Sequence, residues 1–150
     1  MWAYTFGSVG SSAANWNIRS HKSDHQSQVS FIFISEDMNM YLTCSLDGSV
    51  CLYNLWTDAF IRAFHHPKLS PLHSAVLTAS PLAACCFFSR EDHHWYSYSL
   101  NNPGHMLEKQ REECSHMIQP LVIKDSYHMD RLVYGTEKGY LIFRQLPLLK

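Results

Sequence analysis

Histidine and cysteine are the side chains in this sequence with the widest capacity for chemistry, because both bind metal ions and act as catalysts near neutral pH. The chain has 10 histidines and 5 cysteines. None of them repeats at the spacing of a zinc finger, and the motif H-E-x-x-H is absent. We therefore interpret them as solvated or locally hydrogen-bonded and predict no metal site. The three best candidates for metal binding are His65-His66 at a strand end, His93-His94 beside a turn, and Cys114 with His116.

A nucleophilic thiol is the second chemical option. Cys85-Cys86 lies in AACCFF, an apolar run with no neighbouring cation to lower a thiol pKa, so inert core cysteines are expected. The hydrolase motif G-x-S-x-G does not occur. Gly7 and Gly10 in GSVG resemble a phosphate loop only weakly, since no Lys-Ser/Thr pair follows. The sequence predicts no catalytic residue and no cofactor, with a metal-dependent or thiol enzyme as the alternative.

The elements that must carry these side chains are short strands. The stretch Cys44–Leu55, CSLDGSVCLYNL, places the turn pair Asp47-Gly48 between two runs of alternating apolar and polar residues, which is a strong hairpin signal. Val29–Ser35 upstream predicts a buried strand, and Ala59–His66 downstream predicts an outer strand. Together they form one antiparallel four-strand meander.

This meander repeats along the chain. Turns are predicted near Gly10, Asp47, Asp92 and Lys138, at intervals of 37, 45 and 46 residues (47 − 10, 92 − 47, 138 − 92). A four-strand unit at a spacing of about 40–45 residues is typical of a β-propeller blade. We predict an all-β fold: a single partial propeller over residues 1–150, of about three and a half antiparallel four-stranded blades, whose ring this chain alone does not close. The blade fragments are approximately 2–22, 23–66, 67–113 and 114–150.

One segment has the composition of a helix. Met106–Met117, MLEKQREECSHM, contains good helix formers, but it has no apolar stripe along one side. The repeat makes its first half an outer strand. We predict a strand followed by a loop.

The second unit resembles a WD repeat. It offers His25, Thr43, Asp47 and Tyr53 at the positions where that family joins a linker histidine, a strand hydroxyl, a turn aspartate and a tryptophan. The resemblance implies a structural hydrogen-bond network of these four residues. A buried carboxylate must be paired or hydrogen-bonded, and an imidazole, a hydroxyl and turn amides can supply those bonds. Trp16-Asn17 takes the tryptophan position in the first unit.

The other units depart from this pattern. The third has Asp92 but Ser70 where the histidine is expected. The fourth keeps His116, but Lys138 replaces the aspartate and Arg144 replaces the tryptophan, so no such network is expected there.

A narrower likeness extends over the second half of the chain. The run Ala59–Asn101, followed by Gly104–Lys109 and Leu132–Leu146, is similar to the C-terminal WD-repeat propeller of BEACH-domain proteins. The stretch Tyr98–Asn101 and the glycines of the last hairpin carry that similarity. BEACH proteins are large scaffolds in vesicle trafficking, so the likeness implies a trafficking role.

Composition limits the partners. Lys and Arg number 12 against 13 for Asp and Glu, which leaves no basic surface for nucleic acid. No run approaches 18 apolar residues, and the N-terminus does not read as a secretory signal. Five irregularly spaced cysteines favour a reducing compartment. We predict a cytoplasmic protein, associated with membranes only peripherally through partners.

The function that the sequence favours is a non-catalytic protein–protein interaction scaffold that binds proteins or peptides with its turn-lined surface. Trp95, Tyr96 and Tyr98 either fill space between blades or form an exposed partner surface. A further alternative is a fragment without independent function. An open array leaves apolar blade faces uncovered, so the chain is expected to belong to a longer propeller, to pair with another copy, or to aggregate.

Overall fold

The computed structural model describes residues 3–6, 16–20, 24–102, 104–114 and 116–146 of the 150-residue chain. All regular secondary structure in these residues is β-strand, arranged in four antiparallel sheets. The prediction of an all-β fold is confirmed.

Each sheet takes consecutive strands in chain order. The first sheet pairs β1 (Ala3–Phe6) with β2 (Trp16–Ser20). The second contains β3 (Val29–Ser35), β4 (Met40–Ser45), β5 (Ser49–Asn54) and β6 (Phe60–His65). The third contains β7 (Ser74–Thr78), β8 (Ala84–Ser89), β9 (His94–Ser99) and β10 (Met106–Arg111). The fourth contains β11 (Met117–Lys124), β12 (Asp130–Thr136) and β13 (Leu141–Gln145).

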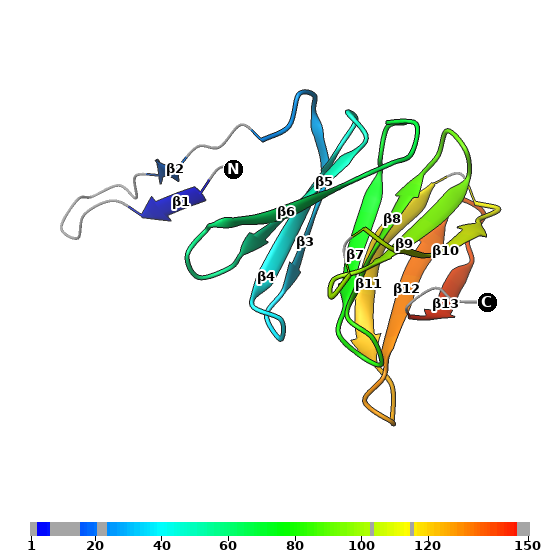
Figure 1. Ribbon diagram of the computed structural model, residues 1–150. Helices are drawn as coiled ribbons and strands as arrows, with labels where there is room; N and C mark the ends of the chain where they lie inside the picture. The colour runs from blue at the N-terminus through cyan, green and yellow to red at the C-terminus, as the bar shows by residue number, and fades with distance from the viewer. Residues whose placement is uncertain (1–2, 7–15, 21–23, 103, 115, 147–150) are drawn as a thin grey trace.

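The second, third and fourth sheets stand side by side (Figure 1). The first strand of each lies next to its counterpart, with β7 in contact with both β3 and β11. This is the radial arrangement of propeller blades around an axis, and the described sheets do not close into a ring. Both features agree with the predicted partial propeller.

The predicted turns lie between the second and third strands of these sheets. Asp47-Gly48 joins β4 to β5, Asp92 lies between β8 and β9, and Lys138 lies between β12 and β13. The turn predicted near Gly10 lies outside the described residues. The strand predicted at the start of 106–117 is confirmed as β10, and it is followed by a loop.

The third sheet is buried on both faces, because it lies between the other two. Along β8, Cys85 and Phe87 pack with Leu42 of the second sheet, whereas Cys86 and Phe88 pack with residues of the fourth. All six residues of β8 are therefore buried, which explains why the run ACCFFS shows no polar alternation. Each large apolar side chain buried in this way contributes about 1.5–3 kcal/mol.

Within the described part of the chain, a neighbouring sheet covers one face of the fourth sheet. Leu132 and Tyr134 of β12 and Ile142 of β13 pack against the third sheet. On the other face, Leu121, Leu141 and Phe143 are exposed. The strand β13 accordingly alternates between exposed and half-buried positions along its length.

Asp130 joins the third and fourth sheets at the start of β12. Its Oδ2 accepts hydrogen bonds from the Thr78 hydroxyl (2.8 Å) and from the amides of Ala79 (2.7 Å) and Ser80 (3.1 Å). Its Oδ1 accepts one from Lys124 Nζ at 2.6 Å. Burial disfavours ionisation of Asp130, but these hydrogen bonds outweigh it and hold the pKa of the carboxyl below its ordinary value.

Candidate functional site

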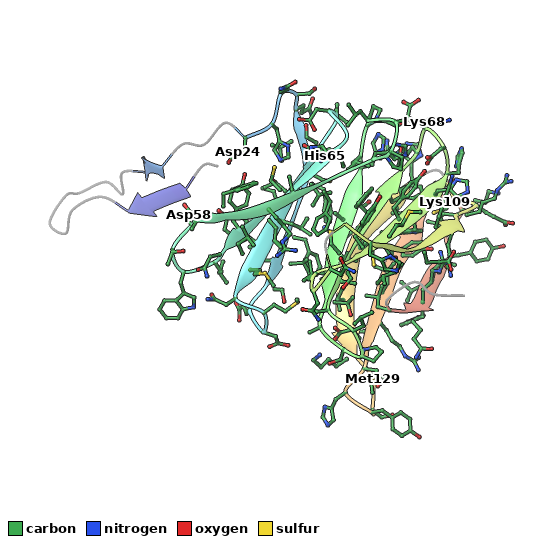
Figure 2. The ribbon with its side chains drawn as sticks, in the orientation of Figure 1. Asp24, Asp58, His65, Lys68, Lys109 and Met129 are labelled. Carbon is green, nitrogen blue, oxygen red and sulfur yellow. The ribbon has the colours of Figure 1, made fainter. Side chains whose placement is uncertain are left out.

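One end of the second, third and fourth sheets carries both the linker that precedes each sheet and the tight turn between its second and third strands. We call this the linker–turn end. His65 and Lys68 lie at this end, and Met129 lies at the opposite end (Figure 2). The polar networks anticipated from the sequence belong here.

In the second sheet, the linker is fastened to the turn through His25. Its Nε2 lies 2.6 Å from the Thr43 hydroxyl and its Nδ1 lies 2.8 Å from the Ser49 hydroxyl. Ser49 donates its own hydroxyl proton to Asp47 Oδ1 at 2.5 Å, so Nδ1–H of His25 is the donor to the Ser49 oxygen. The amide of Gln26 adds a hydrogen bond of 2.8 Å to Asp47 Oδ2.

The ionised form of Asp47 is stabilised by this arrangement. Burial raises the pKa, but hydrogen bonds from Ser49 and Gln26 and the nearby His25 ring (3.6 Å) together hold it below its ordinary value. A charged turn carboxylate thus holds the linker in place.

Tyr53 reaches the same linker by a different bond. Its hydroxyl donates to Asp24 Oδ2 at 2.7 Å, and its ring stacks on Tyr41 with centroids 4.9 Å apart. The structure therefore brings His25, Thr43 and Asp47 together, with Ser49 as the intermediary. Tyr53 is attached through Asp24.

In the third sheet, His66 takes the role of the linker histidine, although the spacing of the repeats predicts that position at Ser70. His66 Nε2 donates to Asp92 Oδ2 at 2.7 Å, and the Tyr96 hydroxyl donates to the same oxygen at 2.5 Å. Nδ1 of His66 accepts from the amides of Lys68 (3.0 Å) and Ser70 (3.3 Å). His66 is 2% exposed. Of the pair interpreted as solvated or locally hydrogen-bonded, His65 is exposed, whereas His66 uses both ring nitrogens in hydrogen bonds inside the fold.

Linker length explains why His66 was missed. His25 precedes its turn residue Asp47 by 22 positions, whereas His66 precedes Asp92 by 26 (47 − 25, 92 − 66). A fixed separation of 22 selects Ser70. The backbone bond from Leu69 N to His66 O (2.9 Å) folds the additional residues into a turn.

The fourth sheet has a network of a different composition at the same place. Glu112 precedes Lys138 by 26 positions (138 − 112), as His66 precedes Asp92. Glu112 accepts hydrogen bonds from the Tyr134 hydroxyl and from Arg144 Nη1 (3.0 Å). Burial opposes ionisation of Glu112, but these bonds and the Arg144 charge keep its pKa below the ordinary value. The expectation that this unit has no network is wrong, because the ion pair of Glu112 with Arg144 fastens the linker in place of a histidine and an aspartate.

His116 does not take part in that network. Its side chain is exposed, and its backbone amide donates to Glu137 Oε2 at 3.3 Å. The linker residue that matters in the fourth sheet is the acidic one four positions earlier.

A cleft of about 470 Å³ opens beside the fourth network. Its lining includes Tyr134, the half-buried Cys114 and Ile142, and the exposed charged residues Glu113 and Lys138. This volume falls in the range of sites that bind small ligands or peptide side chains.

The aromatic cluster of β9 is in the interior. Trp95 is fully buried and packs with Phe88 toward the fourth sheet, and Tyr96 is 3% exposed. Tyr98 is half-buried and stacks on Phe87, with centroids 5.6 Å apart. These positions exclude the exposed partner surface considered for the three residues. The physical reason is that the third sheet is covered on both faces.

Two aromatic side chains outside this cluster, which the sequence analysis does not single out, are exposed instead. Trp56, in the turn between β5 and β6, is 85% exposed, and Tyr127, in the turn between β11 and β12, is 80% exposed. Both lie in turns away from the linker–turn end, where an exposed ring is available for contact with another protein.

The thiols are poorly placed for catalysis. Cys44 and Cys85 are fully buried. Burial raises the pKa of Cys44 to about 12 and that of Cys85 well above its ordinary value. Among the described residues, no group of three or more His, Cys, Asp or Glu side chains is arranged to hold a metal ion.

Comparison with known proteins places this geometry among propellers. No protein-family profile matches the chain. The chain is 30% identical over 83 residues to the BEACH domain-containing protein lvsD of Dictyostelium discoideum, an alignment that covers 47% of this chain and 3% of that protein.

Solved propellers resemble the fold. The WD40 β-propeller domain of Doa1 superposes with a TM-score of 0.57 at 14% identity, over 83% of this chain and 39% of that one. BamB from Moraxella catarrhalis gives 0.62 at 10% identity, over 86% and 38%. BBS1N, solved in complex with ARL6DN, gives 0.61 at 10% identity, over 92% and 40%. The described sheets are blades of a β-propeller, and the chain spans about two fifths of the length of these solved chains.

Proposed function

We propose that this partial β-propeller is a non-catalytic scaffold that binds other proteins through its linker–turn end. The observation that carries the proposal is the anchoring of each linker to its neighbouring turn or strand by a buried polar network. His25, His66 and Glu112 perform this role in the second, third and fourth sheets. Loops held on a rigid β scaffold are typical binding surfaces.

The chemistry of the histidines supports a scaffold over an enzyme. Both ring nitrogens of His25 and of His66 have hydrogen-bond partners within the fold, and the two side chains are only 6% and 1% exposed, so neither ring is open to a substrate. The raised pKa of Cys85 opposes a thiolate nucleophile. A metal-dependent or thiol enzyme is the second candidate, and elemental analysis tests it: stoichiometric zinc or iron in the purified chain would favour it over the scaffold.

The similarity to a BEACH domain-containing protein supports a finer proposal. We infer that the chain acts in membrane trafficking, as part of a BEACH-type scaffold whose remaining propeller lies in a longer polypeptide. On this proposal the protein is cytoplasmic and reaches membranes through partners. In the described residues, no helix has the length and apolar character needed to cross a membrane. BBS1N was solved with a protein partner, which is consistent with this type of role.

The test compares the two ends of the sheets. Lys68 and Glu91 are exposed at the linker–turn end, and exchanging their charges (Lys68→Glu with Glu91→Lys) leaves the net charge at −1. The matched control replaces the exposed aromatics of other turns (Trp56→Ala with Tyr127→Ala). Circular dichroism establishes that both variants fold as the parent does.

Captured cytosolic proteins are quantified by mass spectrometry for the parent chain and both variants. We expect the parent chain to capture trafficking proteins. Their recovery should fall with the charge-exchange variant and persist with the aromatic control. Recovery of chaperones alone, or of partners unaffected by the charge exchange, contradicts the proposal. Loss in the aromatic variant alone moves the binding surface to the other turns and contradicts binding at the linker–turn end.

A further inference from the structure

The linker between the second and third sheets holds a leucine in the left-handed backbone conformation. Leu69 has φ +54°. It is the only apolar residue among the non-glycine residues with positive φ in the described part of the chain; the others are Asn39, Asp58, His93, Gln119 and His128. This conformation is unfavourable for a bulky L-residue, and short polar side chains tolerate it better. A leucine at this position therefore needs a physical reason.

The hydrogen bonds of the linker account for the conformation but not for the leucine. Leu69 N donates to His66 O at 2.9 Å, and the amides of Lys68 and Ser70 donate to His66 Nδ1 at 3.0 and 3.3 Å. These bonds fold the linker around the buried His66 ring. Glycine or asparagine at position 69 would adopt the same backbone with less strain. The turn therefore requires a left-handed residue and leaves the choice of side chain open.

Packing within the fold does not account for the leucine either. Leu69 is 58% exposed, whereas Leu72 in the same linker is fully buried in the core between the second and third sheets. A single exposed leucine is ordinary on a protein surface. An exposed leucine that is also held in an unfavourable backbone conformation is different, because strained positions cluster where proteins bind ligands or carry out chemistry.

The backbone beneath Leu69 is fixed by the turn of the second sheet. A Cβ added to Gly48 would lie 2.5 Å from the Leu69 carbonyl carbon, so the two backbones are in close contact. Leu72 N bonds to Ser45 O at 3.1 Å, which ties the end of the linker to the same sheet. The exposed side chain is thus presented on a preorganised support, and binding would not need to order the linker.

The exposure of Leu69 does not depend on strands outside the described residues. Its linker joins the second and third sheets, and each of these has four strands. The two sheets pack together through β3, β4 and β7. Leu69 therefore lies above a completed pair of neighbouring sheets.

The backbone of this linker offers a partner no amide donor. Residues 67 and 71 are prolines, and every other amide from residue 66 to residue 73 donates to a group within the fold; these are His66, Lys68, Leu69, Ser70, Leu72 and His73. Ser74 begins β7. Contact with another molecule through the linker must therefore use side chains and carbonyl oxygens.

The exposed charges around this end of the sheets are mainly acidic. In the described loops of the linker–turn end, four exposed side chains are acidic and two are basic, a net charge of −2 (2 − 4); they are Asp24, Glu91, Glu113 and Glu137 against Lys68 and Lys138. Figure 2 marks Lys68 at this end. A surface of this sign repels anionic lipid headgroups and attracts a cationic partner.

We propose that Leu69 is the anchor by which the linker–turn end binds a separate protein. The leucine side chain enters an apolar pocket of that protein, and lysine or arginine side chains at the border of the pocket face the acidic loops. This inference rests on the proposed scaffold function, because it names the anchoring residue and the chemistry of the partner.

Crosslinking identifies what the side chain contacts. Photo-leucine, a diazirine analogue of leucine, is placed at position 69 of the full 150-residue chain. The chain is irradiated in cytosol, and crosslinked peptides are sequenced by mass spectrometry. We expect crosslinks to an apolar residue of a separate protein, on a surface that also carries lysine or arginine. Photo-leucine at Leu141, which is 62% exposed, is the matched control and should not label that protein.

Several crosslinking results would overturn the proposal. They are crosslinks confined to this chain or to a second copy, crosslinks to a longer polypeptide that contains this sequence, crosslinks to chaperones alone, and the absence of any crosslink from position 69.

The crosslinked protein is then purified and titrated against variants of the full chain. Leu69→Asn should bind at least about tenfold more weakly, because the apolar contact is lost. Leu69→Met keeps an apolar side chain, and Leu141→Asn makes the same change elsewhere, so each should stay within about threefold of the parent. Raising NaCl from about 0.05 to about 0.5 M should weaken parent binding by at least about threefold. Equal losses in the two asparagine variants, or no effect of salt, contradict the proposal.

Thermal unfolding separates an anchor from a structural residue. Leu69→Asn should leave the Tm unchanged or raise it, because asparagine tolerates the left-handed backbone and the leucine side chain is not packed in the core. A lowered Tm together with weaker binding would assign Leu69 to folding and refute its role as an anchor.

Two further measurements distinguish the alternatives. Sedimentation with vesicles of phosphatidylcholine and phosphatidylserine that depends on Leu69 would assign this side chain to a membrane and refute the protein pocket. If captured trafficking proteins are sensitive to the Lys68–Glu91 charge exchange but not to Leu69→Asn, this inference fails and the proposed function stands. If neither change alters capture, both fail.

Discussion

Replacing Gly48 by alanine tests how tightly the turn of the second sheet holds the next linker. Gly48 has φ +85°, a left-handed conformation that costs an L-residue about 1–2 kcal/mol. An added Cβ would lie 2.5 Å from the carbonyl carbon and 2.6 Å from the Cα of Leu69, both backbone atoms. The linker must therefore shift by several tenths of an ångström, at an overpacking cost of about 1–3 kcal/mol. We expect Gly48→Ala to lower the free energy of unfolding by about 2–5 kcal/mol.

Gly139 provides the control for backbone strain. It has nearly the same conformation, φ +87°, in the equivalent turn of the fourth sheet, and an added Cβ there meets nothing within 4 Å. Gly139→Ala should cost only the conformational part, about 1–2 kcal/mol. Urea unfolding followed by tryptophan fluorescence measures both variants, with the slope m compared to verify similar denatured states. Equal destabilisation by the two substitutions, within about 0.5 kcal/mol, would show that the approach of Gly48 to Leu69 has no energetic weight.

Three more predictions concern buried polar groups. His66→Ala removes a hydrogen bond to an ionised carboxylate and a buried ring, so it should cost about 2–4 kcal/mol in urea unfolding, against less than about 0.5 for the exposed neighbour His65→Ala; similar values would contradict the network. The folded pKa of Asp130 is lowered, so its stabilisation is present above the unfolded pKa and is lost as pH falls through the folded value. Asp130→Asn should therefore be less stable at pH 7 and lose less stability below about pH 4 than the parent in pH-dependent melts, and an unchanged acid slope would count against this account. Cys85 should resist alkylation at pH 8 in the native chain and react in urea, as read by mass spectrometry, and rapid native labelling would be inconsistent with its burial.

The strands and hairpins could be predicted from the sequence because their signals are short-range. Asp47-Gly48 between alternating runs has few alternatives to a hairpin, and the repeat of that hairpin implied sheets that stack side by side. The histidine that fastens the linker of the third sheet could not be predicted in the same way. His66 performs the role of His25 from a linker with four more residues before the turn, and a fixed separation passes over it.

Burial of the aromatic residues depended on the arrangement of whole sheets. Tyr96 and Tyr98 alternate with Ser97 and Ser99 as in a strand of a half-exposed sheet. The third sheet nevertheless has neighbours on both faces, so Trp95 and both serines are buried. The residues around Trp56 indicate that it is exposed, because Asn54 and Asp58 are turn formers that are typical of an exposed loop. Turn chemistry on either side of an aromatic residue would have been the better guide to its exposure.

The anchoring groups at the linker–turn end also bear on how related chains can be recognised. Between the second and third sheets the anchoring histidine moves by four residues, while its carboxylate partner keeps its place in the hairpin; in the fourth sheet an acid and a guanidinium supply the attraction. The attachment recurs in all three sheets, whereas its chemical identity and its distance along the chain differ from sheet to sheet. Relatives of this protein will therefore be found more readily by aligning hairpins and asking which upstream side chain complements them than by matching letters at constant gaps.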